Sequence, residues 1–163
     1  MSLDELRAFA RGPEDGEAQW LLGGLYTYRA VGADNGNAYT VIEVRGHSGL
    51  ATPHHVHDRE EEGFYVVEGE VTLTLGEETI QARAGSFAFA PRGAPHAFRF
   101  ASEDATLLLL LTPGAAGHES LFREMGVRAE RHVIPPPPDG PPDFTRLAEI
   151  AARHGTQITG PPP

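Results

Sequence analysis

Residues 49–69, GLATPHHVHDREEEGFYVVEG, place three histidines and an acidic cluster directly before a run with the pattern of a buried strand. His55 and His57 are two positions apart, so on a strand both imidazoles leave the same face. Residues 58–61 are polar and turn-like, and a short reversal there can set Glu62 opposite the two histidines. Two neutral imidazoles and one carboxylate form a candidate site for a transition metal such as Fe, Mn, Ni, Cu or Zn.

Surface exposure is the alternative explanation of this stretch, because histidine-rich loops and acidic runs such as DREEE are commonly solvated. His54 has the opposite parity to His55, so we expect it to face outward or to lie at the rim of a pocket. The remaining histidines lie outside this arrangement and are expected to be ordinary surface groups: His47, His118, His132 and His154.

A further candidate ligand, His96, lies in residues 85–100, GSFAFAPRGAPHAFRF. Residues 91–93, Pro-Arg-Gly, indicate a turn, after which His96 begins a strand. By alternation, Phe98 and Phe100 share its face. Taken alone, a histidine beside two phenylalanines is more typical of a satisfied core residue than of a metal ligand.

Strands dominate the part of the chain that would position these side chains. Between Trp20 and Thr112, short apolar segments of strand-like period alternate with Gly-, Pro- and Asn-containing turns. The predicted strands are Leu25–Ala30, Tyr39–Arg45, Phe64–Glu68, Val71–Leu75, Thr79–Ala82, Phe87–Ala90, His96–Phe100 and Ala105–Thr112. Strands of this length and spacing predict a β-sandwich or a β-barrel.

Short helices are expected at both ends of the chain. Leu3–Arg11 has helical spacing of its apolar residues, and Ser120–Met125 and Phe144–His154 look helical near the C-terminus. The proline-rich segment 134–144 is interpreted as a stiff strap that carries the last helix back across the barrel, with recognition by a proline-binding partner as the alternative. We therefore expect a single domain over residues 1–163, with a barrel core at about 20–112 and a tail at 113–163.

Composition narrows the range of functions. The 163 residues carry a formal net charge of −10 without a basic stripe, so neither nucleic acid nor an anionic membrane surface is an expected partner. The sequence has no cysteine, so a metal must be held by nitrogen and oxygen ligands. The start of the chain has no apolar core of signal-peptide length, and the longest apolar run, Leu107–Leu111, is too short to span a bilayer. These features predict a soluble, cytoplasmic protein.

The two stretches together resemble both signature motifs of the cupin superfamily. The first motif reads G, five residues, H-x-H, four residues, E, six residues, G, and is met at Gly49, His55, His57, Glu62 and Gly69. The second reads G, five residues, P-x-G, two residues, H, three residues, N, and is met at Gly85, Pro91, Gly93 and His96. Phe100 replaces its terminal Asn, and fifteen residues separate the motifs. The motif glycines suit strand ends, where the backbone reverses without a Cβ.

This resemblance implies a mainly β fold, the antiparallel cupin barrel or jelly roll, with one divalent transition metal (Fe, Mn, Ni, Co, Cu or Zn) deep in its mouth. The ligands it implies are His55, His57, Glu62 and His96. Cupins of this type commonly pair through sheet edges, so a homodimer is expected, with the N-terminal helix or the strand around residues 21–28 at its interface.

Beyond the motifs, the layout is similar to single-domain bacterial cupins of the quercetin 2,3-dioxygenase type, over roughly residues 38–154. That similarity implies a dioxygenase of a flavonol-like or other aromatic or enediol substrate, in which Glu62 is both ligand and catalytic base. The implied substrate-binding walls are Phe64, Val66, Phe98 and Phe100, which alternation sets on the same faces as Glu62 and His96. No arginine of the right parity is evident to neutralise a small dianion such as oxalate. The alternative is a non-catalytic cupin that binds a small molecule or has a structural role.

Overall fold

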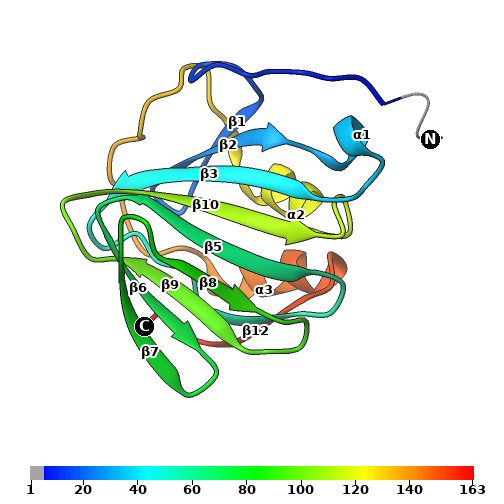
Figure 1. Ribbon diagram of the computed structural model, residues 1–163. Helices are drawn as coiled ribbons and strands as arrows, with labels where there is room; N and C mark the ends of the chain where they lie inside the picture. The colour runs from blue at the N-terminus through cyan, green and yellow to red at the C-terminus, as the bar shows by residue number, and fades with distance from the viewer. Residues whose placement is uncertain (1–5) are drawn as a thin grey trace.

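The computed structural model describes residues 6–163, which form two facing antiparallel sheets (Figure 1). The seven-stranded sheet has the order β11 (Val127–Arg128), β1 (Ala18–Leu21), β2 (Gly24–Ala30), β3 (Thr40–His47), β10 (Asp104–Thr112), β5 (Glu61–Glu68), β8 (Phe87–Ala90). The five-stranded sheet has the order β12 (Thr156–Gly160), β4 (His54–His57), β9 (His96–Phe100), β6 (Glu70–Leu75), β7 (Glu78–Arg83). This confirms the predicted mainly β, jelly-roll architecture, although the two sheets do not close into one continuous barrel.

The core lies between the two sheets because alternate side chains of each strand point inward. Along β10, Leu107, Leu109 and Leu111 are almost fully buried. They share one hydrophobic cluster with Phe64, which pairs with Leu109 in the same sheet, and with Phe98 of the opposite sheet. Each such side chain contributes about 1.5–3 kcal/mol when it is removed from water. The stability of the sheets therefore comes mainly from apolar packing.

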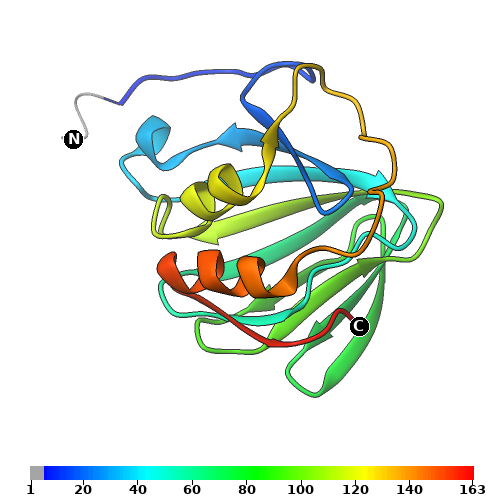
Figure 2. The same cartoon turned by 180° about the vertical axis from the view of Figure 1, so that it is seen from behind.

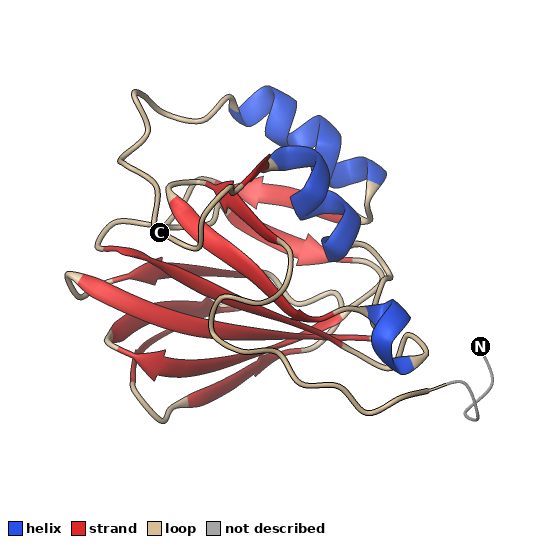
Figure 3. Cartoon of the chain, turned by 90° about the horizontal axis from the view of Figure 1, so that it is seen from above, coloured by secondary structure: helices blue, strands red, loops and turns tan. Residues whose placement is uncertain are grey.

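Helices α2 (His118–Met125) and α3 (Phe144–Arg153) pack together over one side of the sheets, while α1 (Gly32–Asn35) is a single short turn (Figures 2 and 3). The α3 helix begins where the Asp143 carboxylate accepts a hydrogen bond from the Arg146 amide at 3.0 Å, an N-cap interaction. Its buried face carries Leu147 and Ile150. The proline-rich strap connects β11 to α3 (Figure 2). Helices α2 and α3, together with β12, the edge strand that follows α3 and pairs with β4, are called the helical cover below.

Most predicted strand boundaries agree with the structure to within one to three residues, but three expectations need correction. Residues 6–12 are not helical, which contradicts the predicted helix over Leu3–Arg11 in that part; its first residues lie outside the described chain. Strands β1, β11 and β12 were not predicted. Finally, β4 and β5 belong to different sheets, so the link between them crosses from one sheet to the other and does not form a hairpin.

Within residues 6–163, no helix has the length and apolarity needed to cross a membrane.

Candidate metal centre

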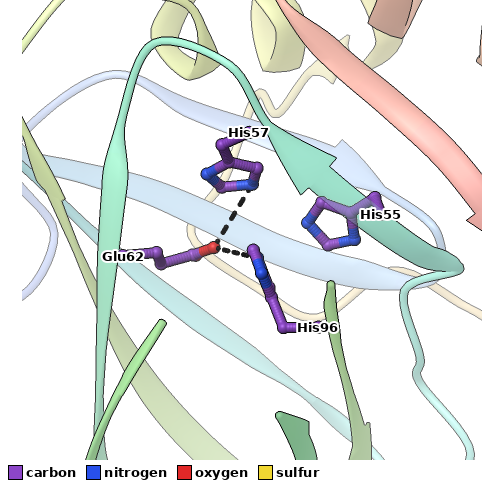
Figure 4. A group of neighbouring side chains, drawn as sticks. All are labelled: His55, His57, Glu62 and His96. Atoms are coloured by element: carbon purple, nitrogen blue, oxygen red, sulfur yellow. Dashed lines mark hydrogen bonds and ion pairs between the residues drawn. The ribbon is translucent and has the colours of Figure 1, made fainter. Parts of the chain in front are cut away.

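Four buried side chains from three strands converge between the sheets (Figure 4). His55 and His57 come from β4, His96 from β9 and Glu62 from β5. One nitrogen or oxygen atom of each lies within 4.8 Å of the corresponding atoms of the other three. The four residues are between 2% and 8% exposed, so the cluster is shielded from bulk water.

Sheet register places these residues. His55 lies directly opposite His96 on the paired strands β4 and β9. Glu62 comes from the facing sheet, where it pairs with Ala90 of β8. The Gly93 amide donates a hydrogen bond to the His57 carbonyl at 3.0 Å, which ties the turn before His96 to β4. At φ 83° Gly93 has a left-handed conformation that side chains disfavour, so the motif glycine is required by the turn.

The Glu62 carboxylate lies between two of the imidazoles. Its Oε2 atom is 3.0 Å from Nε2 of His96 and 3.5 Å from Nε2 of His57 (Figure 4). The His55 ring packs against that of His96, with ring centroids 4.4 Å apart. All four side chains therefore face a common point from different directions.

Two of the histidines are oriented by backbone carbonyls. Nδ1 of His55 lies 2.8 Å from the Pro53 carbonyl oxygen, and Nδ1 of His96 lies 2.9 Å from that of Ala94. When Nδ1 of His55 donates, its Nε2 keeps the lone pair that a metal would bind. Nε2 of His96 has a free lone pair only when it carries no proton for its contact with Glu62. Neither nitrogen of His57 has a hydrogen-bond partner among the described residues, although the ring is buried. A cation at the centre would give His57 the partner that it lacks.

The protonation of the site favours metal ligation at two of its imidazoles. Burial lowers the pKa of His55 and of His57 well below the ordinary histidine value, and repulsion from neighbouring imidazoles lowers both further, so both rings are neutral at pH 7. Burial also opposes protonation of His96, but its hydrogen bond and charge attraction to Glu62 outweigh burial and raise its pKa. A metal that binds Nε2 of His96 would therefore compete with the protonation of this ring.

His118 is the main residue that the sequence-based interpretation missed. It was expected on the surface, but it is 2% exposed and its ring lies against His57, with centroids 4.0 Å apart. Its Nδ1 is 2.6 Å from Oε2 of Glu60, which is also buried. Glu60 belongs to the acidic run DREEE, which suggested a solvated loop. The only feature of the sequence that could have pointed to a role for Glu60 was its position two residues before the proposed ligand Glu62. The Glu60–His118 pair therefore supports the centre from behind His57.

The other histidines lie away from the centre, as expected. His54 is half-buried, and its Nδ1 contacts the Pro161 carbonyl oxygen at 2.6 Å. His47 pairs with Asp104, and His154 pairs with Glu124. His132 is half-buried and lies outside the cluster.

A cavity of about 50 Å³ lies between the centre and the helical cover. His55 and Glu62 form its floor, and the cover contributes mainly apolar side chains: Leu121, Phe122, Met125, Leu147, Ala151 and Ile158. Among the described residues, none of those lining the cavity is an arginine or a lysine. The described lining of the cavity is thus mainly apolar, partly open and without a fixed positive charge.

The four predicted wall residues occupy different positions. Phe98 lines the cavity. Phe64 packs edge-on against the His96 ring at 5.7 Å, and Phe100 packs against Phe98 at the same centroid distance. Phe64, Phe100 and Val66 are buried in the hydrophobic core and are not among the residues that line the cavity. The remaining aromatic walls are Tyr26 and Phe122, which the sequence did not single out.

The donor set fits a divalent transition metal. Imidazole nitrogens and a carboxylate oxygen suit Fe, Mn, Co, Ni, Cu or Zn, and three nitrogens with one oxygen leave coordination positions for other ligands. The unpartnered nitrogens of buried His57 and the buried carboxylate of Glu62 are groups whose desolvation a cation would compensate.

Comparison with known proteins agrees with this geometry. The family described as "Cupin domain" matches residues 42–112, which include all four clustered residues. The chain is 31% identical over 124 residues to quercetin 2,3-dioxygenase of Bacillus subtilis, an alignment that covers 75% of this chain and 36% of that protein. The chain spans between 36% and 59% of the length of the curated relatives that it matches.

Two solved structures share the fold at low sequence identity. KdgF from a Halomonas species has a TM-score of 0.59 at 20% identity, covering 66% of this chain and 94% of that one. An RmlC-like cupin from Shewanella frigidimarina has a TM-score of 0.59 at 18% identity, covering 67% and 94%. Residues 42–112 therefore match the cupin domain family, and the two solved structures share the fold of this chain.

Proposed function

We propose that the protein is a metal-dependent dioxygenase whose substrate presents a compact enediol or α-hydroxyketone group to the metal. The observation that carries this proposal is the buried cluster of three histidines and one glutamate beside a small, partly open and mainly apolar cavity. The similarity to a protein named quercetin 2,3-dioxygenase supports the reaction class. Other reactions also occur on this fold, so the fold alone does not select the reaction.

His55, His57 and His96 are the proposed neutral ligands, and Glu62 is proposed as both ligand and general base. When bound, the metal supplies the Lewis acidity and the redox chemistry for dioxygen that the side chains lack. The Glu62 carboxylate lines the cavity, so it can accept the proton of a substrate hydroxyl that approaches the centre. Its Oε2 already lies 3.0 Å from Nε2 of His96, which holds the carboxylate in place.

Charge and volume both restrict the substrate. The absence of arginine and lysine from the described cavity lining disfavours small dianions, because a buried double negative charge would have no counter-charge beyond the metal. The cavity volume of about 50 Å³ is roughly a third of the ~150 Å³ that accommodates one benzene ring. A compact oxygen-bearing group therefore fits with small side-chain adjustments, whereas a flavonol requires the helical cover to move.

Oxygen uptake by the metal-loaded protein tests the proposal. Protein loaded separately with Fe(II), Mn(II), Ni(II), Co(II) or Cu(II) would be mixed with reductic acid, a small cyclic enediol, or with quercetin. We expect uptake above the protein-free rate with at least one metal, and faster uptake with reductic acid than with quercetin. Glu62→Gln should abolish uptake. Glu61→Gln, an equivalent change at a half-exposed neighbour, should preserve it.

A non-catalytic binding protein is the second candidate, and the small, mainly apolar cavity favours it because such a concave site can hold a small ligand. Absence of uptake with every metal and substrate, together with full metal occupancy, would exclude the dioxygenase in favour of this role.

A further inference from the structure

Two buried hydroxyl groups in the cavity wall have no hydrogen-bond partner. The Tyr26 hydroxyl and the Thr156 Oγ1 atom are both inaccessible to solvent, and no described protein atom pairs with either of them. The residues themselves are 1% and 3% exposed. Both line the cavity that faces the metal centre.

Unpaired buried hydroxyls are uncommon because each loses its hydrogen bonds to water without replacement. A purely structural role would be filled better by phenylalanine and valine, which have similar shapes without the polar atom. Two such groups around one small cavity indicate that the partner is a molecule inside the cavity. Ordered water is the simplest such partner, and an oxygen-bearing ligand that displaces the water is the other.

The two residues reach the cavity lining from opposite sheets. Tyr26 lies on β2 of the seven-stranded sheet, and its ring packs edge-on against Phe122 of the cover at 5.2 Å. Thr156 lies on β12 of the five-stranded sheet, directly opposite His57 in the register. Burial raises the pKa of Tyr26, and the nearby Glu62 charge raises it further, so Tyr26 remains a hydrogen-bond donor.

His118 also lines the cavity, but its Nδ1 is already engaged by Glu60. Thr52 lines it too, and its Oγ1 accepts a hydrogen bond from the Phe98 amide at 3.1 Å. Among the described hydroxyls that line the cavity, those of Tyr26 and Thr156 are buried and have no protein partner of either kind.

We propose that Tyr26 and Thr156 form an oxygen-binding subsite that holds a compact O,O-ligand. Its two neighbouring oxygen atoms are the two hydroxyls of an enediol, or the carbonyl and hydroxyl of an α-hydroxyketone or a hydroxamate. In this arrangement the Tyr26 hydroxyl donates to one ligand oxygen, and the Thr156 hydroxyl donates to or accepts from the other. This inference rests on the proposed function for the ligand's contact with the metal, and it adds the groups that recognise the ligand.

The test uses acetohydroxamate, a five-heavy-atom O,O-ligand, titrated calorimetrically into the full-length protein loaded with Zn(II), which is redox-silent. Tyr26→Phe and Thr156→Val remove the two hydroxyls with little change of shape. Tyr28→Phe is the matched control, because Tyr28 is an equally buried tyrosine on the same strand whose hydroxyl donates to the Glu119 carbonyl at 3.3 Å.

We expect Tyr26→Phe and Thr156→Val each to weaken acetohydroxamate binding by about tenfold, the effect of losing one good hydrogen bond. In the absence of metal and ligand, both variants should unfold at or above the wild-type temperature, since each removes an unsatisfied group. Tyr28→Phe should show the reverse: a lower unfolding temperature and unchanged ligand affinity. Equal affinities for all four proteins, no binding to the wild type, or lower unfolding temperatures for Tyr26→Phe and Thr156→Val would each overturn the subsite.

Failure of the subsite and failure of the dioxygenase are separable. Selective weakening of acetohydroxamate binding in the two variants, without oxygen uptake by the wild type, would support the subsite and reject the reaction. Wild-type oxygen uptake with unchanged KM in both variants would support the reaction and reject the subsite.

Discussion

Replacing Glu60 by glutamine tests whether the buried pair behind His57 supports both the fold and the centre. The Glu60 carboxylate accepts hydrogen bonds from the Gly117 and His118 amides at 3.0–3.2 Å and contacts Nδ1 of His118 at 2.6 Å. It therefore holds the first turn of α2, where a negative charge is favourable. Glutamine keeps one acceptor oxygen but places an NH₂ group against these donors.

Loss of one partner in a buried, hydrogen-bonded pair costs about 3 kcal/mol or more. At roughly 2–4 °C per kcal/mol for a chain of this size, Glu60→Gln should lower the Tm by roughly 6–12 °C. Because the His118 ring rests on that of His57, displacement of α2 also loosens a proposed ligand, and metal affinity should fall by about tenfold or more.

Thermal unfolding of the metal-free protein at pH 7, followed by calorimetry, measures the first effect, and metal titration measures the second. Glu61→Gln is the control, since a change at this half-exposed neighbour should alter stability by no more than about 0.5 kcal/mol. A Glu60→Gln protein that unfolds within roughly 2 °C of the wild type, on the same scale, would show that the pair contributes little and that α2 is held by its apolar face alone.

Three further predictions concern the ligands, pH and assembly. His57→Ala should lose most of its bound metal, measured by atomic absorption, yet keep its β-sheet circular dichroism, because apolar burial stabilises the sheets; metal at the wild-type stoichiometry would contradict the ligand assignment. The pKa of His96 is raised above the ordinary 6.5, and one proton must leave His96 for each metal bound. Metal affinity should therefore fall by about tenfold for each pH unit below that pKa. An affinity that stays constant from pH ~7.5 to ~5 would rule this out. We expect a homodimer, but the strand around residues 21–28, one predicted interface, is largely buried within the chain. The structure instead favours an interface that buries the exposed aromatic side chains of edge strand β8, Phe87 and Phe89, together with Tyr65 of β5. A Phe87→Ser/Phe89→Ser double variant should be monomeric by light scattering, and a wild-type monomer would refute the expectation.

The residues of the candidate centre could be predicted because their signals are local. The H-x-H spacing fixes two side chains on one face of a strand, and glycine and proline turns mark where strands end. For the same reason the predicted strand Ala105–Thr112 differs from β10 by one residue. The sequence predicts that a short reversal of the chain sets Glu62 opposite the histidines. In the structure the chain instead passes from one sheet to the other between β4 and β5, and Glu62 reaches the histidines from the facing sheet.

Long-range partners left no such signal. Glu60 and His118 are 58 residues apart, and each belongs to a polar segment that reads as solvated. Tyr26 and Thr156 meet at the cavity only because β2 and β12 lie in facing sheets. The predicted N-terminal helix failed in residues 6–12 because helical spacing alone does not stabilise a helix without a surface against which to pack.

The helical cover determines which part of a larger ligand can reach the centre. Outside it lies a groove of about 730 Å³, a volume within the ~300–1,000 Å³ typical of sites for organic ligands. Leu21, Leu22, Met125 and Leu147 line both the groove and the inner cavity, so a layer of flexible side chains separates the two spaces. Among these residues, Leu22 has a positive φ of 50°, a conformation that costs energy outside glycine. We therefore expect a ligand with an aromatic body to rest in the groove and to pass only its oxygen-bearing end through this layer, with selectivity set by how far these four side chains yield.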